Sequence, residues 1–137
     1  MKLLDTSVVV DHLRGYAPAT ALLVDLVEVG ETVAGSELTR FELLAGVRPR
    51  ELDDLEAFFA AIEWVPVTEE VARLAGGYAR SYRGSHQGIG VVDCLVAGTA
   101  TALGAELVTM NVRHFPMFNA LQPPYRYSTG PASSPSA

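Results

Sequence analysis

The chain has 137 residues, of which 49% are hydrophobic, and a formal net charge of −6. This length and apolar content are typical of one compact domain with its own core, so we expect no second domain. No apolar run approaches the ~20 residues of a membrane span, and the first residues contain no signal-like apolar stretch. We therefore expect a soluble, cytoplasmic protein with no membrane partner.

Charge and cysteine content narrow the function further. A net charge of −6 disfavours attraction to nucleic acid over the whole surface, but it leaves room for a local basic rim. The arginines near the segments of interest are Arg40, Arg48, Arg50, Arg80, Arg83 and Arg113. We interpret most of them as solvated surface residues. The single cysteine, Cys94, excludes an intramolecular disulfide, and its apolar neighbours are typical of a small buried side chain.

The first half of the chain alternates short apolar segments with helical patterns. Residues 2–4 form a predicted strand that leads through Asp5, Thr6 and Ser7 into a helix over 8–14, which Gly15 ends. A second helix is predicted over 18–29 and a second strand over 32–35. Ser36 and Thr39 then open a helix with an apolar face, and further elements follow. These are a helix over 52–62, a strand over 64–67 and a helix from 68 to about 82.

The second half continues the alternation. Residues 83–90 have the composition of a loop, residues 91–103 form a predicted central helix rich in small side chains, and residues 106–110 form a fourth strand. An edge strand over 123–127 would be a fifth. Residues 1–127 therefore make up the predicted domain, and the low-complexity residues 128–137 are expected to form a disordered tail.

Strands that alternate with helices predict an α/β fold, with a mostly parallel sheet of four or five strands flanked by helices on both sides. In open sheets of this kind the functional site lies at the carboxyl ends of the strands. Asp5 and Asn111 follow predicted strands directly, whereas Glu42 and Asp93 lie in helices that follow a strand or loop. We expect these four side chains to meet at one edge of the sheet.

Three of these residues are acidic and lie within apolar sequence. Asp5 follows Leu3 and Leu4, Glu42 interrupts the apolar face of its helix, and Asp93 lies in the apolar start of the helix over 91–103. Burying a carboxylate costs free energy unless a positive charge meets it. Because Lys2 is the only lysine, a divalent cation is the simplest partner.

Mg²⁺ or Mn²⁺ prefers oxygen ligands and retains several waters, so two or three carboxylates suit such an ion. The chemistry that this arrangement favours is hydrolysis of a phosphodiester, with Thr6 or Ser7 orienting a water or a phosphate oxygen at a helix N-terminus. The three histidines show no metal-ligand spacing, which makes a zinc site improbable. Taken singly, Asp5 and Asp93 also suit helix caps, and Glu42 suits a solvent-facing position.

Four blocks of sequence together resemble a known family. Residues 4–8, 36–46, 91–97 and 108–115 are similar, in order and separation, to the blocks of PIN-domain ribonucleases, and specifically of VapC-type toxins from toxin–antitoxin pairs. The resemblance implies that Asp5, Glu42 and Asp93 bind Mg²⁺ or Mn²⁺. The family usually has a further acidic residue in the last block, where this chain has Asn111. A weaker second metal position then follows, with one-metal or substrate-assisted catalysis left open.

The resemblance also implies partners. It predicts an endoribonuclease acting on RNA, a homodimer, and a VapB-type antitoxin that forms a hetero-oligomer with the toxin and lays a C-terminal segment over the groove. We place that segment near an apolar surface of Phe41, Leu44, Phe58 and Phe59, which suit a core equally well. Arg113 and the loop over 84–90 are expected to contact RNA. His114 either contacts the scissile phosphate or caps its turn, and we favour the cap.

Two other protein families and one non-catalytic module are alternatives to this interpretation. A phosphate-accepting receiver domain needs a lysine after its last strand, and a haloacid-dehalogenase-like phosphatase needs Asp-x-Asp at the first strand. The chain has neither feature, since Asp5 is followed by Thr6 and Ser7. The serious alternative is a PIN-like module that binds RNA or a protein without cutting it, because the last carboxylate is missing.

Overall fold

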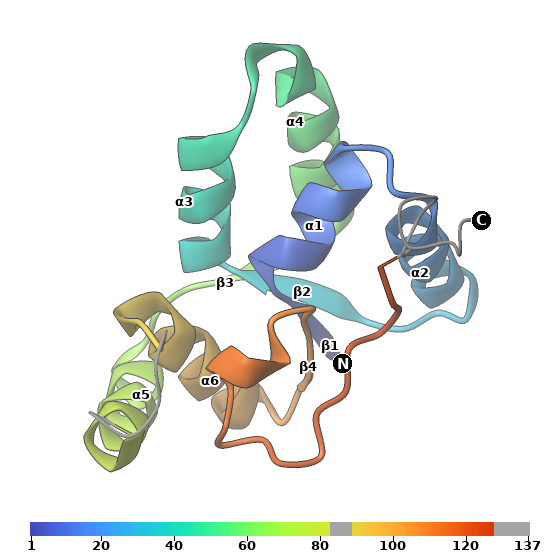
Figure 1. Ribbon diagram of the computed structural model, residues 1–137. Coiled ribbons are helices and arrows are strands. Elements are labelled where there is room, and N and C mark those ends of the chain that lie inside the picture. Colours follow the sequence, from blue (N-terminus) through green and yellow to red (C-terminus); the bar gives the residue numbers. More distant parts are fainter. Residues whose placement is uncertain (83–88, 128–137) are drawn as a thin grey trace, which may run out of the picture.

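The computed structural model describes residues 1–82 and 89–127, so the predicted tail and most of the predicted loop over 83–90 lie outside the described residues (Figure 1). Its centre is a parallel four-stranded sheet in the order β3-β2-β1-β4. The strands are β1 Lys2–Leu4, β2 Val33–Ser36, β3 Glu63–Val65 and β4 Glu106–Val108. The predicted α/β architecture is therefore confirmed.

Helices cover both faces of this sheet (Figure 1). They are α1 Thr6–Leu13, α2 Ala17–Glu28, α3 Glu37–Gly46, α4 Leu52–Ala61, α5 Glu69–Tyr82 and α6 Val91–Leu103, with short 3₁₀ turns η1 Pro49–Glu51 and η2 Val112–His114. None of the described helices combines the length and apolar content that crossing a membrane requires. Helices α5 and α6 pack side by side, and α6 also contacts α3 (Figure 1).

Alternation along the central strand divides the core into two parts. Leu4 packs in a cluster with side chains of α1 to α4, whereas Leu3 packs in a second cluster with side chains of α6 and with Phe115. Neighbouring side chains of a strand point to opposite faces of its sheet, so both faces of β1 are covered. Leu3 and Leu4 are both 0% exposed. Strand β1, which leads directly into Asp5, is thus packed against side chains on both of its faces.

The ends of the helices follow local sequence signals. Arg14 ends α1 and is followed by Gly15 with φ of +80°, a conformation that glycine adopts without strain. Ser36 is the N-cap of α3, where its Oγ accepts a hydrogen bond of 3.1 Å from the Leu38 amide. The Thr68 hydroxyl likewise accepts from the Val71 amide near the start of α5. The predicted caps of α3 and α5 are confirmed.

The predicted strand over 2–4 matches β1, and β2 and β3 are shifted from their predicted bounds by one residue or more. The other two predicted strands differ for physical reasons. Residues 123–127 form no strand, because Pro123 and Pro124 lack the amide hydrogens that a ladder requires. Strand β4 ends at Val108 rather than at Met110. The Met110 amide donates to Ser7 Oγ and the Asn111 amide donates to Thr109 Oγ1, so neither extends the sheet.

The predicted apolar face of α3 is not a core face. Thr39 and Leu43 are its buried residues, whereas Phe41 is 63% and Leu44 is 44% exposed. Phe58 and Phe59 belong instead to the core, each 8% exposed, and Trp64 packs edge-on against both rings. Of the two alternatives predicted for these four residues, Phe58 and Phe59 therefore take the core position, whereas Phe41 and Leu44 form an exposed apolar surface.

Candidate active site

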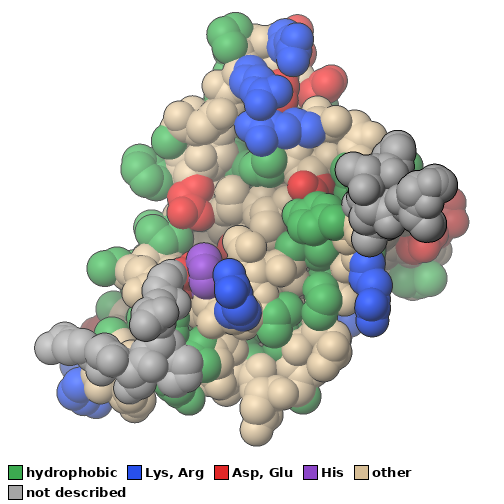
Figure 2. All heavy atoms as spheres, in the orientation of Figure 1, with side chains coloured by type: hydrophobic (Ala, Val, Ile, Leu, Met, Phe, Trp, Pro, Cys, Tyr) green, Lys and Arg blue, Asp and Glu red, His purple; other side chains and the backbone are tan. Residues whose placement is uncertain are grey.

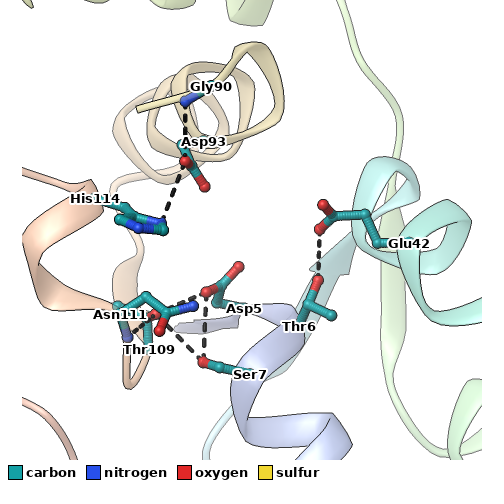
Figure 3. A network of polar contacts seen from close by, with 9 residues as sticks. All are labelled: Asp5, Thr6, Ser7, Glu42, Gly90, Asp93, Thr109, Asn111 and His114. Carbon is teal, nitrogen blue, oxygen red and sulfur yellow. Dashed lines mark hydrogen bonds and ion pairs between the residues drawn. The ribbon is translucent and has the colours of Figure 1, made fainter. Parts of the chain in front are cut away.

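Four segments distant in sequence meet at the carboxyl edge of the sheet. Asp5 directly follows β1 and Thr109 directly follows β4, while α3 starts at the end of β2 and carries Glu42. Asp93 lies in the first turn of α6. Figure 3 shows the three carboxylates directed toward a common space from these different elements. The predicted meeting of side chains at this edge is thus found.

Asp5 is the most buried of the three, at 6% exposure. The Thr109 hydroxyl donates to its Oδ2 over 2.7 Å, and the Ser7 hydroxyl lies at 3.5 Å from the same atom. Burial raises the pKa of Asp5 above its ordinary value of 3.8, and the charges of Asp93 and Glu42 raise it further, while the hydrogen bonds from Thr109 and from the Thr6 backbone oppose this change. Its side chain makes no helix-cap hydrogen bond, so capping does not explain this aspartate.

Glu42 and Asp93 are each held by polar contacts with neighbouring residues. The Thr6 hydroxyl at the start of α1 donates to Glu42 Oε1 over 2.7 Å. Asp93 Oδ2 accepts from the Gly90 amide over 3.1 Å and lies 3.5 Å from Nδ1 of His114 (Figure 3). The expected capping role of Asp93 is therefore present as well, although its carboxylate also faces the shared space.

The charges of this site are not balanced by basic side chains. Among residues 1–82 and 89–127, no lysine or arginine lies within 4.0 Å of the carboxylates of Asp5, Glu42 or Asp93. Lys2 instead pairs with Glu106 on the surface. Arg40, the arginine nearest in sequence to Glu42, is also engaged elsewhere. Arg40 pairs with Glu37 over 2.7 Å, and its guanidinium carbon lies 4.5 Å from the centre of the Trp64 ring.

These side chains line a cavity of about 620 Å³, which we call the acidic groove. Its walls are Asp5, Thr6, Ser7, Val10, Asp11, Leu13, Arg14, Glu42, Leu43, Gly46, Val47, Glu51, Asp93, Asn111, His114 and Tyr127. Figure 2 shows red acidic side chains around the middle of this face, with blue basic side chains next to the purple histidine and toward the top. Thr6, Ser7 and His114, which were predicted to contact substrate, line the groove. Arg113, predicted with them, is exposed and does not line it.

The groove offers carboxylate oxygens to a metal ion but no complete ligand set. Within the described part of the chain, no three Asp, Glu, His or Cys side chains lie close enough together to coordinate one ion directly. Mg²⁺ and Mn²⁺ commonly take one or two carboxylates and complete their shell with water. The donors present therefore fit a hydrated ion of this kind, with some carboxylates acting through water.

Sequence patterns missed several residues that line the groove or contact its lining. Thr109 is 0% exposed and donates to Asp5, and its position just after an apolar strand was the available signal. Asp11, Arg14, Glu51 and Tyr127 also line the groove, but no local pattern marks them. Arg83 and His86 lie outside the described residues, as does most of the predicted RNA-contacting loop.

Residues 2–117 match the PIN domain family. The chain belongs to the PIN-domain family. This PIN-domain protein is 60% identical to Ribonuclease VapC19 of Mycobacterium tuberculosis over 125 residues, which cover 91% of this chain and 100% of that protein. It is 41% identical to Ribonuclease VapC10 of the same species, covering 91% of this chain and 93% of that one. The chain is thus a member of the VapC group, as the four sequence blocks predicted.

Solved structures agree with this fold. A toxin–antitoxin complex from Klebsiella pneumoniae aligns with a TM-score of 0.76 at 19% identity, covering 93% of this chain and 100% of that chain. VapBC2 from Rickettsia felis, bound to a DNA fragment from its promoter, aligns with a TM-score of 0.74 at 22% identity, covering 85% of this chain and 91% of that chain. At these identities the likeness shows that the PIN fold is shared.

Proposed function

We propose that this VapC-type PIN-domain protein is a metal-dependent endoribonuclease toxin that hydrolyses RNA phosphodiester bonds and is neutralised by a VapB-type antitoxin. One observation supports this most strongly. Three carboxylates from separate elements, one of them buried, face the same groove, and no described lysine or arginine lies within 4.0 Å of any of them. Such a placement costs free energy in folding and suits a site that binds a cation. The names of the VapC relatives supply the substrate class.

In this proposal Asp5, Glu42 and Asp93 hold Mg²⁺ or Mn²⁺, with waters completing the shell. When bound, such an ion lowers the pKa of a coordinated water and neutralises charge on the phosphate. Thr6 and Ser7 were predicted to orient a water or a phosphate oxygen, but in this proposal they orient carboxylates instead. The Thr6 hydroxyl donates to Glu42, and Ser7 lies between Asp5 and the Met110 amide, so both orient carboxylates.

The remaining predicted residues receive narrower roles. Asn111 lines the groove, and its uncharged amide offers a hydrogen bond to a phosphate or a water. His114 lies beside Asp93 and positions that carboxylate. Arg113 belongs to the proposal only as a contact for RNA outside the groove, because it does not line it. We propose a cytoplasmic location, where cellular RNA is available as a substrate.

The partners form part of the same proposal. The solved relatives are toxin–antitoxin complexes, and an antitoxin segment that carries an arginine would complement the acidic groove. The exposed apolar side chains of Phe41 and Leu44 on α3 are a surface available to a second protein chain, which suits the proposed homodimer or the antitoxin.

Cleavage of RNA tests the function directly. Purified full-length protein is incubated with total cellular RNA and Mg²⁺ or Mn²⁺, and the new RNA ends are mapped. We expect cleavage that EDTA abolishes. Asp5→Ala and Asp93→Asn should each reduce the rate by at least about a hundredfold, the upper range for losing a contact that only supports a metal ligand. Glu106→Gln, which removes an exposed carboxylate outside the groove, should cleave at the wild-type rate.

Two results would contradict the proposal. Cleavage that persists in EDTA would remove the role of the metal. RNA binding without cleavage under all metal conditions would favour the inert PIN-like module.

A further inference from the structure

An exposed aromatic ring lies at the wall of the acidic groove. Tyr127 lines the same cavity as Asp5, Glu42 and Asp93, yet its side chain is 55% exposed. An aromatic ring this accessible at the wall of a cavity can offer a face to a ligand. Among the groove residues within the described chain, Tyr127 is the only aromatic side chain other than His114.

This ring is fixed in place by α1 and its neighbours. The Tyr127 hydroxyl donates to Asp11 Oδ2 over 2.8 Å, and the Tyr125 hydroxyl donates to the same oxygen over 2.7 Å. The Tyr16 hydroxyl donates to the Arg126 carbonyl over 2.8 Å. The ring of Tyr127 also packs against Tyr16 and Tyr125, with centroid separations of 5.6 and 6.2 Å. Residues 125–127 therefore form a strap that presents Tyr127 in one orientation.

The hydroxyl of this tyrosine stays protonated. Burial and then the hydrogen bond to Asp11 raise the pKa of Tyr127 to about 12. At neutral pH the contact between Tyr127 and Asp11 is thus that of a neutral donor with a carboxylate. The ring adds no charge to the groove.

The charge of the groove explains why an aromatic contact would be needed. Its described acidic residues are Asp5, Asp11, Glu42, Glu51 and Asp93, whereas Arg14 is its single described arginine and lies 3.8 Å from Glu51. Most affinity for nucleic acid normally comes from basic side chains that meet phosphates. This groove repels phosphates until a cation is bound, so a contact independent of charge would help to hold RNA beside the carboxylates.

We propose that Tyr127, held by Asp11 and by the rings of Tyr16 and Tyr125, is a stacking platform for one nucleobase of single-stranded RNA at the acidic groove. Every base has a π-face, and bases of single strands commonly stack on tyrosine. This inference rests on the proposed function and deepens it by naming a substrate-binding residue. It makes no demand on the metal, so it is testable without cleavage.

The test measures RNA binding in EDTA, where cleavage does not occur. Full-length protein is titrated into a fluorescein-labelled single-stranded RNA of about 12 nucleotides, within the usual length for a single-strand site. Tyr127→Phe should bind more tightly than Tyr127→Leu, because the ring remains although its hydrogen bond to Asp11 is lost. Tyr127→Leu and Tyr127→Ala should bind about 5- to 100-fold more weakly, the range that loss of one stacked base gives. The ratio should stay the same between about 50 and 200 mM salt, because no phosphate contact is lost.

A second arm changes the RNA instead of the protein. Single abasic sites are placed at each position of the same RNA. For the wild type at least one abasic RNA should bind as weakly as the intact RNA binds to Tyr127→Leu, and for Tyr127→Leu that abasic site should have no further effect. This arm compares the wild type with Tyr127→Leu only, so it decides the question even if the alanine variant fails to fold.

Several results would overturn the inference. They are equal RNA affinity for the wild type, Tyr127→Leu and Tyr127→Ala, additive losses from Tyr127→Leu and every abasic site, or no RNA binding by the wild type in EDTA. Metal-dependent cleavage with the same KM in Tyr127→Leu as in the wild type would reject the stacking role while leaving the proposed function intact. Absence of both binding and cleavage would reject both.

Discussion

At the scale of single residues, Asp5 is the side chain whose position is hardest to explain by folding alone. It is 6% exposed, and the described residues supply it with hydroxyl and backbone donors but no cation. Burial and two neighbouring carboxylates raise its pKa, so its ionised form is disfavoured in the folded protein without metal. A residue kept despite such a cost is typical of a functional site.

Asp5→Asn should therefore stabilise the metal-free protein. Because the folded-state pKa of Asp5 lies above its unfolded value, the unfolded chain releases this proton first as the pH rises. Ionisation of Asp5 therefore lowers the free energy of unfolding. This loss of stability is zero below about pH 4, near the unfolded pKa, and reaches its full size above the raised folded pKa. In EDTA, urea unfolding should show Asp5→Asn to be more stable than the wild type at about pH 7.5, by about 0.5–2 kcal/mol. At about pH 4 the difference should shrink.

The matched control is Asp25→Asn, which alters an exposed aspartate on α2 and should change stability by less than about 0.5 kcal/mol at either pH. An Asp5→Asn variant less stable than the wild type at neutral pH in EDTA would show that the carboxylate is already satisfied within the protein.

At the scale of elements, the contact between α5 and α6 sets the position of Asp93. Helix α6 approaches α5 closely at Gly98, where an added Cβ would lie 2.8 Å from the Val71 carbonyl oxygen and 3.0 Å from the Ala75 nitrogen. Both are backbone atoms, which do not move aside as a flexible side chain would. The small residues predicted for a tightly packed helix over 91–103 therefore have this contact as their physical reason.

Gly98→Ala should destabilise the protein even though alanine favours helices. Overpacking of a core typically costs about 1–3 kcal/mol, which exceeds the gain of about 1 kcal/mol from helix propensity. Gly76→Ala on α5 is the matched control, since nothing lies within 4 Å of its added Cβ and only the propensity gain applies. Urea unfolding of both variants checks this. Equal stabilisation by the two substitutions would mean that the helices are not in close contact at Gly98.

Elements also show how far the sequence leads. Helices α5 and α6 were predictable because capping by Thr68 and the apolar start at Val91 are local signals, and α6 matches its predicted bounds of 91–103. The orientation of α3 could not be predicted, because an apolar face of a helix has the same sequence pattern whether it packs in the core or against a partner protein. Phe41 and Leu44 have the helical spacing of core residues and yet are exposed.

At the scale of the whole molecule, the parallel sheet explains why the site could be placed from the sequence at all. Parallel strands end at the same edge, so residues that follow β1 and β4 had to be neighbours, and Asp5 and Thr109 are hydrogen-bonded although 104 positions separate them. The contact of Asp11 with Tyr125 spans 114 positions and follows from no strand order. Long-range contacts made by side chains outside the sheet therefore could not be predicted from the sequence.

Direct binding of Mn²⁺ is the most direct test of the central claim, that Asp5, Glu42 and Asp93 together form a metal site. Electron paramagnetic resonance measures the free Mn²⁺ that remains when protein is added. We predict that the wild type binds Mn²⁺ and that Asp5→Asn, Glu42→Gln and Asp93→Asn each lower the affinity at least about tenfold, while Glu106→Gln leaves it unchanged. Equal Mn²⁺ affinity in the wild type and in all three groove variants would contradict the account.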